Sequence, residues 1–131
     1  MALHDANIET CTKFYTDYCG LKVIDHRHDS ASTVVWLAED AKSDDFITVL
    51  ISHGAQKKHA SNDFSHLGFA LDSIESVNAL ATKAREQGCL VWEPREEPYP
   101  LGYYCGIQDP NGNVVEFSFG QPLGDKHPTF L

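Results

Sequence analysis

The 131-residue sequence predicts an α+β fold made of two consecutive βαβββ modules. Short runs rich in β-branched and aromatic residues are interrupted by two segments with helical periodicity. The order of these elements in residues 1–54 is repeated in residues 64–120. Matching short segments also recur 66 positions apart, NIE at residues 7–9 and SIE at residues 73–75. A duplicated module explains all three observations.

The first module spans residues 1–54. Residues 1–6 are predicted as a strand, and Asn7 as the N-cap of a helix that ends at Gly20. Apolar side chains recur at helical spacing between these two positions. Three further strands are predicted at residues 21–28, 32–38 and 46–53.

The second module spans residues 64–120, after a polar segment of residues 55–63 that is predicted as a linker. A strand at 65–71 is followed by a helix that starts after Ser73 and ends at Gly88. Residues 89–93 form a strand, and the proline-rich residues 94–100 are predicted as a loop. Residues 101–120 form a hairpin around the turn sequence DPNGN, because proline, asparagine and glycine suit successive turn positions. Residues 121–131 are predicted as a C-terminal tail.

Composition narrows the function class. The formal net charge of −9 argues against nucleic acid or an anionic membrane as the partner. No apolar run has transmembrane length and no signal pattern begins the chain, so we expect a cytoplasmic protein. The four cysteines lack metal-binding spacing and are expected to be reduced thiols. Phosphate-binding glycine loops and a GxSxG motif are also missing from the sequence.

Two ionisable residues of the second module form the candidate site. Glu116 lies in the middle of the last strand, and His66 opens the first strand, whose residues on the same face, Gly68 and Ala70, are small. If these strands are neighbours, an imidazole and a carboxylate converge, and such a pair suits Zn, Ni, Co, Mn or Fe(II). A hydrogen bond between the two side chains in a polar patch is the alternative. A nucleophilic Cys105 beside His66 is disfavoured, because no third residue orients the pair.

Three segments carry a resemblance to a known family: FYTDYCGL (residues 14–21), SHLGFALDSIESV (65–77) and GYYCGIQDPNGNVVEF (102–117). With them, residues 1–120 resemble the vicinal oxygen chelate superfamily of glyoxalase I, fosfomycin and bleomycin resistance proteins and extradiol dioxygenases. The resemblance implies that the modules curl into an open mixed sheet, a half-barrel, and pair or exchange in a homodimer. It also implies a metal held by the first and last strands of each module, with His66 and Glu116 as metal-binding and catalytic residues.

Two positions depart from the family pattern. The spacing of 66 places Leu50 where glyoxalase I has a glutamate, and the first-strand position of the first module falls before Met1. The resemblance places His4 at a substrate-binding position, although an exposed terminal residue is an equal interpretation. Trp36, Tyr103 and Tyr104 are expected to line the pocket, although aromatic residues are more often used in cores.

The resemblance therefore predicts a metal-dependent lyase or dioxygenase. The metal would act as a Lewis acid on two neighbouring oxygens of a small substrate. A metal-free protein that sequesters a small molecule between two chains, as bleomycin resistance proteins do, is the alternative. A structural or regulatory dimer with a vestigial cleft also stays open.

Overall fold

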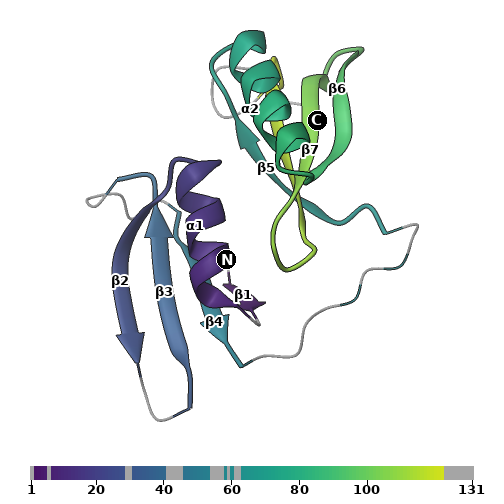
Figure 1. The fold of residues 1–131 in the computed structure, drawn as a ribbon. Coiled ribbons are helices and arrows are strands. Elements are labelled where there is room, and N and C mark those ends of the chain that lie inside the picture. Colours follow the sequence, from purple (N-terminus) through teal and green to yellow (C-terminus); the bar gives the residue numbers. More distant parts are fainter. Residues whose placement is uncertain are drawn as a thin grey trace. The chain divides into compact units, whose positions relative to one another are not determined.

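The computed structural model describes the backbone of residues 2–5 and, with side chains, residues 7–28, 31–40, 46–53, 58, 60 and 63–122. The chain divides into two compact units (Figure 1). The first contains residues 1–64 together with 109–113, and the second contains residues 65–108 and 114–131. Most of the expected linker and residues 123–131 of the expected tail lie outside the described residues.

The first unit is a four-stranded sheet covered by one helix. Its elements are β1 (Ala2–Asp5), α1 (Ile8–Asp17), β2 (Lys22–His28), β3 (Thr33–Ala38) and β4 (Thr48–Ser52). The strand order is β1-β4-β3-β2, with β1 parallel to β4 and the other pairs antiparallel. The side chain of Asn7 accepts a hydrogen bond from the Thr10 amide at 3.2 Å, which caps α1 as predicted.

The core of the first unit lies between α1 and one face of this sheet. Cys11, Phe14 and Tyr15 are the buried residues of the helix. The buried strand residues are Val35, Leu37, Ala38, Thr48 and Leu50. Alternation along the strands places their neighbours on the opposite face.

The prediction that Leu50 is the equivalent of Glu116 in the first module was wrong. Leu50 is completely buried and pairs with Val35, so it faces the helix-covered side. Glu116 lies on the uncovered face of its own sheet, so the structural equivalent of Glu116 is Val49 or Ile51. Aligning the modules with a constant offset of 66 residues did not take the alternation of side chains into account. Because successive side chains of a strand point to opposite faces, an alignment that is wrong by one residue pairs a covered position with an uncovered one. Neither Val49 nor Ile51 can bind a metal, so the first unit still offers no ligand from β4.

The second unit repeats the same topology. Its elements are β5 (His66–Ala70), α2 (Ile74–Glu86), β6 (Leu90–Glu97), β7 (Gly102–Gln108) and β8 (Val114–Phe119). The strand order is β5-β8-β7-β6, with β5 parallel to β8. The α+β class and the repeated βαβββ order are therefore confirmed. Both sheets are open and uncurled, so the expected curl of each half-barrel is not seen.

β6 is longer than predicted. The strand continues through Pro94 to Glu97, where a loop was expected. β6 is an edge strand, and its register with β7 shifts between Trp92 and Arg95. Proline is tolerated at such a place because the missing amide hydrogen is not needed for pairing. The extension matters because it places Arg95 in the sheet, beside Tyr104.

The core of the second unit lies under α2. Val77, Ala81 and Ala84 of the helix are buried, as are Cys105, Ile107, Val115 and Phe117 of β7 and β8. Residues of even number on β5, β7 and β8 consequently lie on the face that α2 leaves open. In the described part of the chain, neither helix has the length and apolar character that crossing a membrane requires.

Candidate functional site

The open face of the second sheet brings His66 and Glu116 together. The two residues lie on adjacent parallel strands, β5 and β8, and Gly68 is in register with Glu116. His66 Nε2 is 3.7 Å from Glu116 Oε1. The imidazole is 33% exposed and the carboxylate only 14% exposed. The pair therefore meets at a surface from which an external molecule can reach the imidazole, while the acid is largely enclosed.

The second carboxylate oxygen of Glu116 has its own partner. Gln121 donates a hydrogen bond from Nε2 to Glu116 Oε2 at 3.3 Å, and the same amide nitrogen donates to the Leu101 carbonyl oxygen at 3.0 Å. A Cβ atom placed on Gly68 would lie 3.6 Å from Oε2, so this glycine borders the carboxylate directly. Gln121 thus fixes the carboxylate and leaves Oε1 directed to His66.

Aromatic residues of β6 and β7 continue the open face beyond the pair. Trp92 lies edge-to-face with His66, with ring centres 5.2 Å apart, and edge-to-face with Tyr104 at 6.5 Å. The indole lies on Gly106, because a Cβ atom there would be only 2.5 Å from the Trp92 ring. Trp92 therefore holds one side of the imidazole in place.

Tyr104 ends this aromatic row with a polar group. Its hydroxyl accepts a hydrogen bond from Arg95 Nε at 3.0 Å, and the guanidinium carbon is 5.4 Å from the centre of its ring. Of the two tyrosines predicted to line the pocket, Tyr104 is the one that shares the face of His66 and Glu116.

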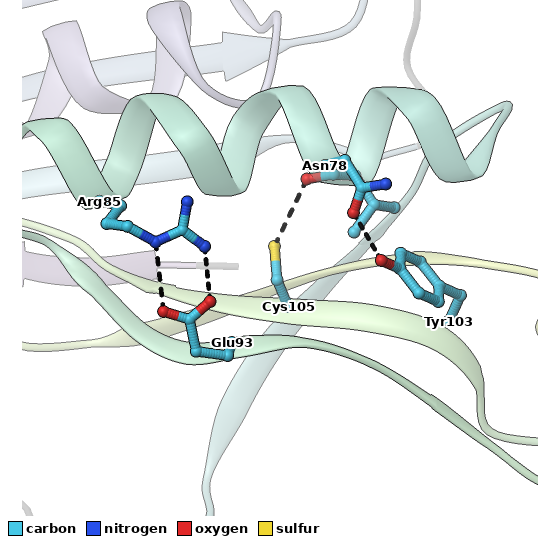
Figure 2. Close-up of polar contacts among 6 residues, drawn as sticks. Asn78, Arg85, Glu93, Tyr103 and Cys105 are labelled. Atoms are coloured by element: carbon cyan, nitrogen blue, oxygen red, sulfur yellow. Dashed lines mark hydrogen bonds and ion pairs between the residues drawn. The ribbon is translucent and has the colours of Figure 1, made fainter.

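Tyr103 does not lie there. Its hydroxyl donates a hydrogen bond to Asn78 Oδ1 of α2 (Figure 2), so the side chain faces the helix. Cys105 has the same orientation, with its sulfur 4.0 Å from the Val77 carbonyl oxygen. Burial and the charge of Glu116 raise the pKa of Cys105 to about 11. Cys105 is therefore a protonated core thiol at neutral pH and no nucleophile for His66.

The remaining predicted site residues belong to the first unit. Trp36 is partly exposed, and the guanidinium carbon of Arg27 lies 5.2 Å from the centre of its ring. The backbone of His4 is in register with Ile51, while its side chain lies outside the described residues. Both residues are in a separate unit from His66 and Glu116.

The geometry of the pair fits two ligands of one metal ion. With ligand bonds of about 2.1 Å, two donor atoms on one ion are roughly 3.0 to 4.2 Å apart for bond angles from 90° to 180°. The measured separation of 3.7 Å lies inside this interval. Among the residues that the structure describes, no group of three or more His, Cys, Asp or Glu side chains is arranged to hold an ion. The described part of the site therefore supplies an imidazole and a carboxylate.

Sequence reasoning missed Trp92, Arg95 and Gln121. Gln121 was assigned to the tail, and Arg95 to a loop. Trp92 had a usable signal, since it is an aromatic residue in a predicted strand. Gly106, on the predicted hairpin, was a second signal, because a glycine in a strand often marks the close approach of another group.

The chain was compared with known proteins. The family model of the glyoxalase/bleomycin resistance protein/dioxygenase superfamily matches residues 1–117. The uncharacterized protein PA2024 of Pseudomonas aeruginosa is 51% identical over 124 residues, covering 95% of this chain and 89% of that protein.

Two solved structures show the same fold. A fosfomycin resistance protein, FosX, from Listeria monocytogenes, determined as a mutant with Mn(II) and 1S,2S-dihydroxypropylphosphonic acid, matches with a TM-score of 0.73 and 13% identity, over 92% of this chain and 88% of that chain. A mutant glyoxalase I from Zea mays matches with a TM-score of 0.71 and 22% identity, over 88% of this chain and 42% of that chain. The match to the family model spans both modules and ends one residue after Glu116. The chain belongs to the glyoxalase/bleomycin resistance protein/dioxygenase superfamily.

Proposed function

We propose that the protein is a metal-dependent enzyme, a lyase or a dioxygenase, that acts on a small oxygen-bearing substrate in the cytoplasm as a homodimer. His66 and Glu116 are its metal-binding and catalytic residues, and Fe, Mn, Ni, Co or Zn is the ion. The observation that carries the proposal is the 3.7 Å separation of His66 Nε2 and Glu116 Oε1 on an open sheet face. Membership of the superfamily supports it, and the FosX structure with Mn(II) and a small diol is a related example.

Gln121 and Trp92 would support the two metal-binding residues. The metal, when bound, supplies a Lewis acid for neighbouring oxygens of the substrate. Gln121 holds the Glu116 carboxylate in one orientation, and Trp92 limits rotation of the His66 ring. Such support keeps ligand atoms in place and is the usual role of residues behind a metal ligand.

Substrate contact is assigned to Tyr104 in the second unit and, from the sequence, to Trp36 and His4 in the first. The Tyr104 hydroxyl and the Arg95 guanidinium form a polar end to the apolar indole surface. A substrate with both an apolar part and oxygen atoms suits such a surface. Tyr103 is left out of this assignment, because it bonds to α2.

The alternative function is metal-free binding of a small molecule. It is favoured by the count of two ionisable ligands in the described part of the site, where tightly bound catalytic ions usually have three protein ligands.

Thermal unfolding in the presence of each metal separates the two functions. We expect Mn(II), Fe(II), Co(II), Ni(II) or Zn(II) to raise the melting temperature of the wild type, because a ligand at 100 times its Kd stabilises the folded state by about 2.7 kcal/mol. Glu116→Gln should lose this shift for the cognate ion, and Gln121→Ala should reduce it.

Glu93→Gln is the matched control. Glu93 is an exposed carboxylate on the helix-covered side, where it pairs with Arg85 (Figure 2), and exposed pairs contribute little stability. This variant should respond to metal as the wild type does. Equal curves for the wild type and Glu116→Gln with every metal would refute the metalloenzyme proposal and leave metal-free binding.

A further inference from the structure

The first unit, which does not contain the strands of His66 and Glu116, has a groove of its own. It is formed between α1 and the strands β2 and β3, and its volume is about 580 Å³. Its lining includes His26, His28 and Thr33 on the strands and Glu9 and Lys13 on the helix. All belong to the first unit, and none of them is assigned a role in the function proposed above.

Two histidines stand side by side in this groove. His26 and His28 are two residues apart on β2, which places both on the same face of an edge strand. Their ring centres are 4.8 Å apart and their planes are inclined by 71°. The strand backbone therefore holds two imidazoles next to each other at an exposed position.

A hydrogen bond orients one of the rings. His28 Nδ1 lies 2.9 Å from the hydroxyl oxygen of Thr33, the residue paired with His28 across the β2–β3 hairpin. When Nδ1–H donates to this hydroxyl, Nε2 carries the free lone pair. Metal-binding histidines commonly have their second ring nitrogen fixed in this way.

We propose that His26 and His28 together chelate a divalent transition metal ion, with Cu(II) bound more tightly than Ni(II) or Zn(II). With metal–nitrogen bonds of about 2.1 Å, each ring centre lies roughly 3.2 Å from the ion, so two rings at a near-tetrahedral angle have centres roughly 5 Å apart. The observed 4.8 Å matches this value. The metal preference follows the general order of affinities of nitrogen ligands.

The surroundings of the site leave the ion accessible. Glu9 and Lys13 line the helix side of the groove, so that side carries one formal charge of each sign. Two imidazoles fill only part of the coordination of a transition metal. The other positions face water or a donor atom of a molecule in the groove.

The test is titration calorimetry with Cu(II), Ni(II) and Zn(II) on protein without a polyhistidine tag, in a Glu116→Gln background that disables the other candidate site. His26→Asn and His28→Asn should each weaken binding at least tenfold, and the double variant should lose one equivalent of metal. His53→Asn is the control, because His53 is an exposed histidine of the same unit at a left-handed position, φ 64°, that asparagine tolerates.

Nuclear magnetic resonance locates the ion. Paramagnetic Ni(II) should broaden the amide signals of residues 26–28 and of their paired residues 33–35 before others. Unchanged stoichiometry and affinity in the double variant, or broadening that spares β2, would overturn the proposal. Failure of metal to stabilise the protein through Glu116 would not affect it, because every measurement here is made without that carboxylate.

Discussion

Gly106 is the residue on which the position of Trp92 depends. Alanine at this position would place a methyl group 2.5 Å from the indole, which must then move away from His66. We expect Gly106→Ala to lower the free energy of unfolding by roughly 1–3 kcal/mol, as overpacking does. The near-ultraviolet circular dichroism of the tryptophans should change with it.

Gly68→Ala is the comparison for Gly106→Ala. Its methyl group would meet Glu116 Oε2 at 3.6 Å, an ordinary contact, so the change in unfolding free energy should stay within roughly 0.5 kcal/mol. Equal losses in the two variants would show that the indole is not seated on Gly106.

Cys105 gives the protein a pH dependence on the alkaline side. Its pKa rises from 9.0 to about 11 because of burial and the charge of Glu116. Below pH 9 the thiol is protonated in both the folded and unfolded chains. Between pH 9 and 11 only the unfolded chain releases the proton, so stability falls across this window by roughly 2–3 kcal/mol.

Denaturant titrations from pH 7 to 11 check this expectation. Cys105→Ala should show a smaller loss of stability above pH 9 than the wild type. The pKa values of Tyr15 and Cys19 are also raised, mainly by burial, so part of the alkaline loss will persist. Parallel stability curves for the two proteins above pH 9 would contradict the assignment to Cys105.

Part of the site, including the choice between Tyr103 and Tyr104, could be predicted from the alternation of side chains along the strands. Alternation of side chains along β8 is enough to place Glu116 on the face opposite Val115 and Phe117, which are buried. The same rule allows only one of Tyr103 and Tyr104 on that face, and applying it would have excluded Tyr103. Gln121 was beyond prediction, because its bond to Glu116 depends on the path of the chain after the last strand.

At the scale of elements, Asp109 organises the turn that joins β7 to β8. Its Oδ1 accepts hydrogen bonds from the amides of Asn111 and Asn113, and its Oδ2 accepts from the Asn113 side chain and from the Tyr15 hydroxyl at 2.7 Å. Asp109 is only 4% exposed, so water could not easily replace its carboxylate as the hydrogen-bond acceptor of these donors.

We expect Asp109→Ala to cost roughly 3–5 kcal/mol, because several buried donors lose a charged acceptor. Tyr15→Phe removes one of the bonds and should cost roughly 1–2 kcal/mol. Chemical denaturation of both single variants and the double variant measures the coupling. A double variant whose loss equals the full sum of the single losses would show that the Tyr15–Asp109 bond adds nothing.

The order of elements was predictable, and the edges of the elements were less so. Caps such as Asn7 and Ser73 and the DPNGN turn act locally, so the sequence alone identifies them. Pro94 was taken as the start of a loop because proline breaks paired strands. It is accommodated at a register shift on an edge strand, and only the sheet order reveals that β6 is an edge.

At the scale of the whole molecule, exposed apolar side chains support the proposed dimer. Phe46, Phe64, Tyr99 and Leu101 are each more than half exposed, and aromatic side chains of this kind are enriched in interfaces. We expect sedimentation equilibrium to give twice the 14.6 kDa mass of the chain.

Salt provides a second measurement on the dimer. Two chains of charge −9 repel each other, so raising the ionic strength from about 0.01 to 0.15 M should tighten association as the Debye length shortens. A species of single-chain mass at every salt concentration, at tens of micromolar protein, would contradict the proposed homodimer.

The grouping of residues 109–113 with the first unit has a practical consequence for anyone dissecting this protein. A fragment that stops before residue 64 would contain α1 and its sheet but not Asp109, which accepts the hydrogen bond of the Tyr15 hydroxyl. The buried hydroxyl of Tyr15 would then lack the hydrogen-bond acceptor that it has in the whole protein. The separately expressed first half should therefore be poorly stable alone, and adding the second half, which carries Asp109, should restore its structure.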